Sequence, residues 1–390
     1  MELLGPQVSP RGNMKIHVSE DVRESPRAII KAIGVGGAGG NAINRMAEAG
    51  IKAVELIAAN SDAQDLRRSL AHVRIQIGEK LIKGLGVGGD SVKGRMAMEE
   101  SVDQIREVLQ GSDLVFITAG MGGGTGTGGA PLIAKIAREL GALTIGVVTR
   151  PFHFEKLNRA TIAEQGIQEM RKNVDTLLVI PNQRLLDVSD PETTDDAAFR
   201  LADDVLRKAI QSISDVITTP GKINMDLNDI RAVMKDAGEA LIGMGEASGD
   251  GRAVSAAKAA IRSPLLENVV MDGAKGLIVN ITSCKDTLRL SEMEEVMDLI
   301  TGAASPDAKI KMGKAYDNSL GDSIRITVIA TGFPPRKGAH NLSRAGVKFG
   351  AGELSPNEKR DPGFSTPHSQ NTSDDWSKPA FLRLKVRKLK

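Results

Sequence analysis

The sequence has few of the features that stabilise secreted or membrane-embedded proteins. Its only cysteine, Cys284, can form neither an intrachain disulfide nor a structural zinc site, which needs several cysteine or histidine ligands. No segment approaches the ~20 consecutive apolar residues of a membrane-spanning helix, so an integral membrane protein is excluded. Residues 1–25 also lack an apolar stretch of signal-peptide length. We therefore expect a protein of the reducing cytoplasm.

The composition is otherwise that of a globular protein with a sizeable core. Hydrophobic residues make up 41% and charged residues 26% of the 390 positions, which excludes a largely disordered chain. This length corresponds to two or three domains of roughly 150 residues each. The 51 Lys and Arg nearly balance the 49 Asp and Glu, for a formal charge of +2. Aromatic residues reach only 3%, and the 42 glycines are clustered, which indicates particular loops rather than general flexibility.

Short apolar segments alternate with longer amphipathic segments in the first half of the chain. We expect strands over 28–35, 53–59, 73–77, 113–119, 143–149 and 176–180. Between them we expect helices over 41–49, 62–70, 92–109, 131–140 and 162–173. Brief apolar strands separated by helices are typical of a mostly parallel sheet that is buried on both faces. The predicted fold class is therefore α/β.

A long helix is expected over 194–214, where Leu201, Val205, Ala209 and Ile213 form one apolar stripe at a spacing of four. Such a helix of ~20–25 residues extends ~30–37 Å, the width of a small domain. It would carry the chain from one face of the first domain to the opposite face. A second, smaller α/β domain is expected beyond it. Its elements are helices over 226–235 and 251–261, followed by strand, helix, strand and strand over 276–282, 292–300, 308–312 and 323–330.

Two glycine-rich loops each lie between a predicted strand and a predicted helix. The first runs from Gly34 to Asn41 and contains G-x-G-x-x-G, whose backbone N–H groups and helix N-terminus suit a phosphate. On its own this motif is weak, because a tight strand-to-helix turn needs the same glycines. A dinucleotide-binding fold would also place an acid at the end of the second strand, where the chain has Ala58, Ala59 and Asn60. The missing acid argues against a nicotinamide-dependent oxidoreductase.

The second loop, from Gly120 to Pro131, is more specific. It has six glycines between Gly122 and Gly129 and two threonines whose hydroxyls can donate to phosphate oxygens. Pro131 is expected near the first turn of the next helix. Ordering so many glycines costs backbone entropy, which argues against a simple turn. Two such loops at the carboxyl ends of parallel strands indicate a bound polyphosphate. No G-x-x-x-x-G-K-[ST] motif occurs, so a Walker-type site is excluded.

The segment GGGTGTGG resembles the signature loop of the tubulin/FtsZ family, and GVGGAGGNAINRM resembles the FtsZ form of the first loop. The similarity extends from about Ile29 to Gly332 and resumes where KPAFLR resembles the C-terminal peptide of that branch. The chain is identified as a member of this family, in its branch of bacterial cell-division GTPases. The resemblance implies a tubulin-like fold, hydrolysis of GTP to GDP and phosphate, and head-to-tail polymerisation into the cytokinetic ring. It also implies a cytoplasmic location at mid-cell, beneath the inner membrane.

The resemblance also assigns the nucleotide-binding residues. They would be Gly37, Ala38, Gly39, Gly40 and Asn41 at the inner phosphates, Gly124, Thr125 and Gly126 at the outer phosphates, Glu155 and Arg159 at the ribose, and Asn182, Asp203 and Phe199 at guanine. A carboxylate accepts from the N1–H and N2–H₂ of guanine but repels the N1 acceptor of adenine. From spacing alone, Glu155 and Arg159 could instead form an i, i+4 salt bridge, and Phe199 could be a core aromatic. Mg²⁺ is expected as a phosphate counter-ion, with no protein ligand assigned.

The family's catalytic loop corresponds to Asn224, Asp226 and Asp229, whose acids would polarise the attacking water. From spacing alone, Asp226 would instead cap the next helix, with Asp229 favourably placed in its first turn. The family's usual phenylalanine is Leu227 here. The long helix would separate these acids from the glycine loops by roughly 30 Å. The acids would therefore be too far from a nucleotide bound at the loops of the same chain to act on it. A second subunit stacked head to tail would supply the acids, and a contact of this kind that does not close produces a filament.

The chain is accordingly divided into six parts. These are a flexible arm (1–27), a nucleotide-binding GTPase domain (28–193), a central connecting helix (194–220), a C-terminal α/β domain (221–331), a disordered linker (332–375) and a basic C-terminal peptide (376–390). The linker is rich in Pro, Gly, Ser, Asn and Lys and has no periodicity. The final peptide carries six Lys or Arg and no acid.

By the same resemblance, the C-terminal peptide would bind membrane-anchoring and regulatory division proteins. Its extra positive charge over 384–390 adds direct contact with anionic lipid as a secondary hypothesis. No specific nucleic-acid partner is expected. Two rival functions stay open at this point: a nicotinamide-dependent oxidoreductase built on the first loop, and a tubulin-like filament that partitions DNA or plasmids. The C-terminal peptide argues against the second.

Overall fold

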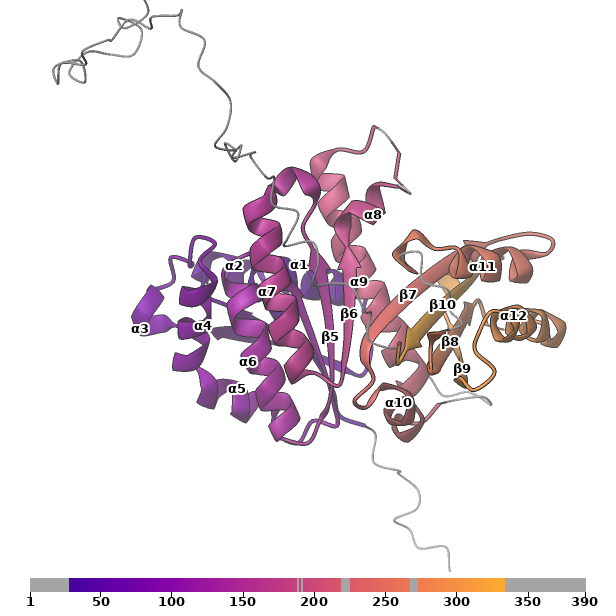
Figure 1. Cartoon of the computed structure of the whole chain (residues 1–390), viewed down its shortest axis with the longest axis horizontal. Coiled ribbons are helices and arrows are strands. Elements are labelled where there is room, and N and C mark those ends of the chain that lie inside the picture. The colour runs from indigo at the N-terminus through magenta and orange to yellow at the C-terminus, as the bar shows by residue number, and fades with distance from the viewer. Residues whose placement is uncertain are drawn as a thin grey trace, which may run out of the picture. The chain divides into compact units, whose positions relative to one another are not determined.

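The computed structural model describes residues 28–333 with the exception of 188, 191, 219–224, 267–272 and 286. The predicted arm 1–27, the linker beyond residue 333, the C-terminal peptide and the candidate residue Asn224 therefore lie outside the described residues. Figure 1 shows the arrangement of the helices and strands.

The first six strands form a parallel sheet. They are β1 (Ile30–Val35), β2 (Val54–Asn60), β3 (Val73–Gln76), β4 (Leu114–Gly120), β5 (Leu143–Arg150) and β6 (Thr176–Pro181). β1 lies between β2 and β4, and every neighbouring pair among the six is parallel. The chain therefore builds the sheet outward from β1 in one direction and then, beginning with β4, in the other. The predicted α/β class with a parallel sheet is confirmed.

Helices cover both faces of this parallel sheet (Figure 1). They are α1 (Gly36–Glu48), α2 (Ala63–Arg68), α3 (Glu79–Ile82), α4 (Ser91–Glu100), α5 (Val102–Leu109), α6 (Thr125–Glu139), α7 (Leu157–Asn173), α8 (Asn182–Leu186) and α9 (Asp195–Thr218). Because successive strand residues point to opposite faces, the sheet separates two cores. Val115 and Ile117 of β4 pack with α4 to α7, whereas Leu114 and Phe116 pack with α1 and α9.

The predicted long helix is confirmed as α9, which is continuous over 24 residues. At 1.5 Å per residue it is ~36 Å long. Val205, Ala209 and Ile213 are buried along its predicted apolar stripe, and Leu201 is partly buried against the same core. Packing of this stripe against the sheet, rather than helix propensity alone, stabilises the helix.

Beyond α9 the chain forms the second half of the sheet. Its elements are α10 (Leu227–Met234), β7 (Gly238–Ala247), α11 (Arg252–Ile261), β8 (Gly276–Ser283), α12 (Leu290–Gly302), β9 (Lys309–Tyr316) and β10 (Ile324–Thr331). β10 is antiparallel to β7 and to β8, while β8 and β9 are parallel. β7 pairs in parallel with β6 from Thr176↔Gly238 to Leu178↔Ala240. The result is a ten-stranded sheet with the order β3-β2-β1-β4-β5-β6-β7-β10-β8-β9.

The sequence pattern does not predict β7, because glycines and acids interrupt its apolar residues. Two of these glycines are required by α11, which packs closely over the strand. A Cβ on Gly243 would lie 2.2 Å from the Ala260 carbonyl oxygen, and a Cβ on Gly245 would lie 2.1 Å from that of Ala256. Glycine within a strand often marks such a close approach of another backbone.

Several predicted helix boundaries are wrong, among them the start of α7, which lies at Leu157 and not at residue 162. The helix expected over 92–109 is two helices, α4 and α5, which are separated at Ser101. α1 begins at Gly36 rather than Asn41, and α6 begins at Thr125, so Pro131 lies inside α6 and not near its first turn. Glycines of the loops form the first helical turns because neighbouring elements leave no room for side chains. A Cβ on Gly128, for example, would lie 2.1 Å from a carbonyl oxygen of α4.

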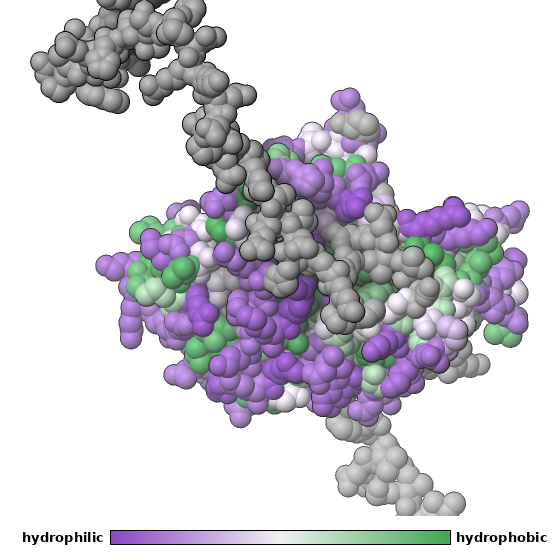
Figure 2. All heavy atoms as spheres, viewed as in Figure 1, coloured by the Kyte–Doolittle hydropathy of each residue, from purple (hydrophilic) through white to green (hydrophobic). Residues whose placement is uncertain are grey.

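Polar and charged residues cover most of the face drawn in Figure 2, where hydrophobic residues form small separate groups. Within the part of the chain that the structure describes, no helix is both long enough and apolar enough to cross a membrane.

Candidate nucleotide-binding site

An open cavity of about 430 Å³ lies at the carboxyl ends of β1, β2, β4 and β5. The sheet changes its direction of growth between β1 and β4, and this is the place where open α/β sheets bind ligands. Ten of the thirteen residues expected to bind a nucleotide line this cavity: Gly37, Ala38, Gly124, Thr125, Gly126, Glu155, Arg159, Asn182, Phe199 and Asp203. The other three, Gly39, Gly40 and Asn41, do not.

The first glycine loop has a binding part and a packing part. Gly36 has a φ of 71°, in the left-handed region that favours glycine, and it turns the chain from β1 into α1. The exposed Gly37 and Ala38 follow at the start of α1, where no side chain caps the helix. Gly39 is buried, and a Cβ there would lie 2.5 Å from the Thr118 carbonyl oxygen of β4. Its role in this structure is close packing, while Asn41 is exposed one turn further along α1.

The second glycine loop brings another uncapped helix N-terminus to the same cavity. Gly124 precedes α6 and makes no side-chain capping bond. The Thr125 hydroxyl lies 2.7 Å from that of Ser61, at the wall of the cavity. The two loops are in contact, because a Cβ on Gly36 would lie 3.0 Å from the Gly126 nitrogen. The positive ends of α1 and α6 therefore converge, which favours a polyanion.

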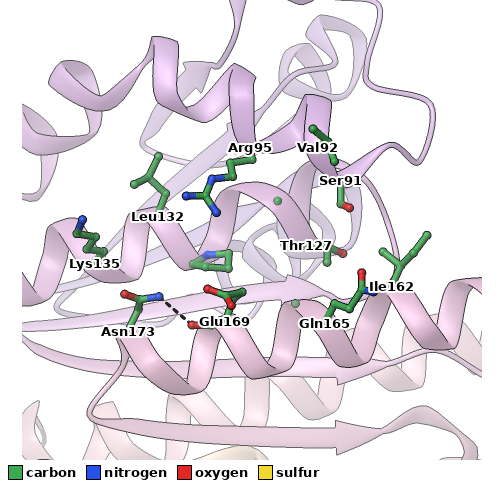
Figure 3. Close-up of a pocket in the computed structure, with 13 residues that line it drawn as sticks. Ser91, Val92, Arg95, Thr127, Leu132, Lys135, Ile162, Gln165, Glu169 and Asn173 are labelled. Atoms are coloured by element: carbon green, nitrogen blue, oxygen red, sulfur yellow. Dashed lines mark hydrogen bonds between the residues drawn. The ribbon is translucent and has the colours of Figure 1, made fainter. Parts of the chain in front are cut away.

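The two threonines of this loop face different cavities, although the hydroxyls of both were expected to donate to phosphate oxygens. The Thr127 hydroxyl accepts a hydrogen bond from the Gly122 backbone N–H at 2.9 Å and so fixes the turn before α6. Thr127 faces a second cavity of about 380 Å³ between α4, α6 and α7. In Figure 3, Arg95 and Lys135 extend from α4 and α6 beside this second cavity, opposite Glu169 of α7. It lies outside the candidate nucleotide site.

Glu155 and Arg159 form the i, i+4 salt bridge that their spacing suggested, and they also line the candidate nucleotide cavity. Arg159 Nη1 lies 3.0 Å from Glu155 Oε2. Glu155 Oε1 accepts from the Phe152 backbone N–H at 2.8 Å, so this carboxylate is held by two partners. The Glu155 side chain is 7% exposed and that of Arg159 is 51% exposed. The structure is thus compatible with both the structural and the ribose-binding interpretation.

Polar groups lie at the far end of the cavity, beside an aromatic cluster. Asn182, at the start of α8, is buried, and its Oδ1 has no hydrogen-bond partner among the described residues. An unpaired buried acceptor is costly, so a ligand donor would stabilise it. Phe199 is 41% exposed and packs edge-on against Phe152, at a centroid distance of 5.4 Å. Its ring is therefore available to a ligand and is not a core aromatic.

Asp203 of α9 lines this cavity and has a strongly raised pKa. Burial raises the pKa of its carboxyl to about 7, and the positive charge of Arg45 on α1 partly offsets that rise. A buried carboxyl without a full set of partners binds its proton more tightly than one in water. Asp203 can therefore act as a neutral acid or as a carboxylate near neutral pH. Two donors from a ligand would favour the carboxylate.

One wall of the cavity comes from residues that the sequence interpretation missed. It comprises Leu85 to Gly89, between α3 and α4, together with Ser61, Asp62 and Asp65 after β2. Gly84, Gly86, Gly88 and Gly89 all have φ values between 59° and 85°. The signal that could have revealed this wall is the segment GLGVGG, which is a third glycine cluster.

The acids of the candidate catalytic loop lie at the other end of the molecule. Asp226 caps α10, and its Oδ1 accepts from the Asp229 backbone N–H at 2.8 Å. Arg231 of α10 reaches the carbonyl oxygen of Asp113, just before the amino end of β4, whereas the cavity lies at the carboxyl end of that strand. Fifteen residues of α9 follow Asp203, a length of ~22 Å. Neither acid lines the cavity.

Two parts of the chain match known families. Residues 29–190 match the GTPase domain of the Tubulin/FtsZ family, and residues 238–334 match the C-terminal domain of the FtsZ family. An FtsZ dimer from M. jannaschii is 41% identical, with a TM-score of 0.77 over 80% of this chain and 90% of that chain. The chain belongs to the tubulin/FtsZ family. A point-mutant FtsZ from M. jannaschii has the same identity, 41%, and a TM-score of 0.76, over 79% of this chain and 92% of that chain.

A more distant solved structure has the same fold. CetZ2 from Haloferax volcanii, solved as a GTPγS-bound protofilament, is 19% identical with a TM-score of 0.68, over 79% of this chain and 94% of that chain. Membership in this GTPase family makes the chain an FtsZ-like protein that binds GTP and GDP and hydrolyses GTP. The GTPase-domain match covers both glycine loops, and the activity of this family is GTP hydrolysis and not nicotinamide-dependent oxidation or reduction.

Proposed function

We propose that this FtsZ-family GTPase polymerises head to tail into filaments that form the cytokinetic ring at the division site. GTP would occupy the 430 Å³ cavity, with its phosphates at the N-termini of α1 and α6. Guanine would lie against Asp203 and Asn182, beside Phe199, and the ribose against Glu155 and Arg159. The converging helix N-termini support this orientation because they can satisfy the triphosphate charge with backbone N–H groups.

Mg²⁺ fits this site as a counter-ion held mainly by the phosphates and by water. Among the described residues, no group of three or more His, Cys, Asp or Glu side chains converges to hold a metal ion. The hydroxyls of Ser61 and Thr125, 2.7 Å apart at the cavity wall, would offer neutral oxygens to such an ion. When bound, Mg²⁺ would neutralise charge that develops on the phosphates.

The observation that carries the proposal is the separation of the cavity from Asp226 and Asp229. A group that polarises the attacking water must lie within hydrogen-bond reach of it. The two acids lie beyond the far end of α9, so they cannot reach a nucleotide in the cavity of their own chain. A second subunit stacked on the first would bring its Asn224, Asp226 and Asp229 to that nucleotide. Such a heterologous contact leaves a free end at each side and therefore propagates as a filament.

The relatives support self-association: an FtsZ from M. jannaschii is solved as a dimer, and CetZ2 from Haloferax volcanii as a protofilament. In the proposed arrangement, 28–193 is the nucleotide-binding domain, 194–220 the connecting helix and 221–331 the domain that supplies the acids. The linker 332–375 would connect the filament to the basic peptide 376–390. That peptide would bind membrane-anchoring and regulatory division proteins, with direct lipid contact as a secondary role, and would hold the ring beneath the inner membrane.

The test is GTP turnover per subunit as a function of protein concentration. If the site is shared, turnover is near zero below a threshold concentration and rises above it, and Asp229→Asn lowers it by at least ~100-fold while GTP still binds. Constant turnover per subunit at every dilution would mean that one chain is catalytically complete. The head-to-tail mechanism would then be wrong, although GTP hydrolysis itself would stand.

Mixing two inactive variants tests the shared site directly. Asp229→Asn binds GTP but lacks the acid, whereas Asp203→Ala retains the acid but loses the guanine contact. In a mixed filament, the acid of the Asp203→Ala chain would act on GTP held by the Asp229→Asn chain, and turnover would recover. The matched control is the Asp203→Ala/Asp229→Asn chain, which should rescue neither partner. Absence of recovery in filaments that contain both chains would contradict catalysis between subunits.

A tubulin-like filament with another role, such as partition of DNA, shares this site and differs in its partners. The 41% identity to FtsZ and the match to the FtsZ C-terminal domain favour the division role over that alternative. A pull-down with the peptide 376–390 separates them. Recovery of membrane-anchoring division proteins would support the ring, and recovery of a DNA-binding adaptor would support partition.

A further inference from the structure

Asp229 is held on both sides of its carboxylate. Lys311 Nζ lies 2.6 Å from Oδ1, and the Asp226 backbone N–H donates to Oδ2 at 3.3 Å. The Asp229 N–H in turn donates to Asp226 Oδ1 at 2.8 Å. The side chain is thus fixed by a cation from β9 and by a reciprocal capping box at the start of α10.

The partner of Asp229 comes from a distant part of the sequence. Lys311 lies on β9, the last strand of the sheet order, 82 residues from Asp229. The side chains of Lys311 and Asp229 are 40% and 32% exposed, so the pair is open to a molecule placed against this end of the protein. The hydrogen bond from Lys311 is the main reason that the pKa of the Asp229 carboxyl is lower than usual, with the Asp226 N–H as a further cause.

We propose that Lys311 is a positioning residue for GTP hydrolysis, because it fixes the Asp229 carboxylate in the orientation that acts on the nucleotide of the next subunit. This inference rests on the proposed head-to-tail function. A free aspartate side chain samples several rotamers, and catalysis depends on holding the reacting groups in one geometry. An ammonium group at Oδ1 selects one of these rotamers. Lys311 itself has no contact with water or phosphate in this mechanism.

The direct test removes the ammonium and keeps the length of the side chain. We expect Lys311→Met to lower the turnover of fully polymerised protein about tenfold, with unchanged GTP affinity of the dilute chain. Lys311→Arg retains a donor and should recover most of the turnover. The matched control is Lys309→Met, because Lys309 is exposed two residues earlier on the same strand and the same face of the sheet. It should behave like wild type.

A double-mutant cycle distinguishes positioning of Asp229 from a general structural effect. If Lys311 acts through Asp229, Lys311→Met should cause no further loss of turnover in an Asp229→Asn chain. An equal tenfold loss in both backgrounds would overturn the inference, as would wild-type turnover of Lys311→Met. Thermal unfolding of each variant, followed by circular dichroism, checks that the native fold is retained. Should Lys311→Met not fold, Lys311→Gln takes its place in the cycle.

Failure of this inference can be separated from failure of the proposed function. If turnover depends on concentration and Asp229→Asn abolishes it, but Lys311→Met does not change it, the shared site stands and only the role of Lys311 is refuted. If wild-type turnover per subunit is the same at all dilutions, the shared site is refuted, and the role of Lys311 falls with it.

Discussion

Ionisation of Asp203 should control guanine-nucleotide affinity around neutral pH. Burial raises the pKa of this carboxyl to about 7 in the free chain, with Arg45 opposing part of the rise. The N1–H and N2–H₂ groups of guanine pair with the carboxylate and not with the neutral acid. A bound guanine therefore lowers the pKa of Asp203, and affinity must increase as the pH rises through 7.

The magnitude follows from the ionised fraction of Asp203 before binding. With a pKa of about 7, that fraction is about 1/11 at pH 6 and about 10/11 at pH 8. If Asp203 is fully ionised in the complex, its contribution makes the Kd about tenfold lower at pH 8 than at pH 6. This corresponds to about 1.4 kcal/mol of binding free energy.

Isothermal titration calorimetry of the dilute chain with GDP measures this dependence without hydrolysis or assembly. The terminal phosphate of the nucleotide, with a pKa of about 6, titrates in the same range, so the informative quantity is the difference between variants. Asp203→Asn should bind more weakly and lose about tenfold of the pH dependence between pH 6 and 8. The matched control is Asp204→Asn, the neighbouring acid of α9. Burial raises the pKa of the Asp204 carboxyl, but hydrogen bonds from Arg207 and Lys208 bring it below its usual value.

The Asp204→Asn chain should retain the full pH dependence of the wild type, because Asp204 does not line the cavity and is already ionised over this range. Equal pH dependence in the wild type and in Asp203→Asn would refute the reasoning. It would mean either that guanine does not contact Asp203 or that burial does not raise its pKa.

The remaining predictions concern stability and are measured on the nucleotide-free chain. Burial raises the pKa of Asp203 from 3.8, its ordinary value in an unfolded chain, to about 7 in the folded chain. The stability that protonation of Asp203 contributes is therefore lost as the pH rises through 7, so Asp203→Asn should raise the Tm at pH 8 and should have little effect on it near pH 4. Gly128→Ala should cost at least ~1–3 kcal/mol in urea unfolding, because its Cβ would overlap a carbonyl of α4, whereas Gly302→Ala, with nothing within 4 Å, should cost much less. Arg252→Met should cost about 3–5 kcal/mol, since the buried guanidinium bonds Glu292 at 2.7 Å and its loss leaves that carboxylate without its cation. A chain in which Glu292→Gln accompanies Arg252→Met should recover part of that loss.

Local sequence patterns were sufficient to predict the parallel strands, the long helix and the two glycine loops. Strands buried on both faces must be continuously apolar, and the stripe of α9 repeats at helical spacing, so both features are visible within a short window. The resemblance to a family added roles for residues such as Glu155 and Arg159. Their spacing alone could not separate a ligand contact from a helical salt bridge, and in the structure they both form the bridge and line the cavity.

Structural features that depend on contacts with neighbouring elements could not be predicted from local sequence patterns. The sequence pattern does not predict β7, because Gly243 and Gly245 lower its strand propensity. The backbone of α11 leaves no room for a Cβ at either position, so the structure requires these glycines. The start of α6 was misplaced because Gly128 fits under α4, so glycines that are typical of a loop form a helix. In each case the residue type is explained by a contact that is distant in sequence.

The sequence by itself determined the α/β class, because its core pattern is local. The resemblance of its two glycine loops to those of the tubulin/FtsZ family implied GTP hydrolysis, because these motifs are specific. Only the tertiary structure decided which glycine faces the cavity: Gly37 lines it, whereas Gly39 is buried against Thr118. Tertiary structure also brought Lys311 to Asp229, across 82 residues of chain. Contacts of this kind depend on strand order and register, which are set by the packing of the whole sheet and are not encoded in any short segment.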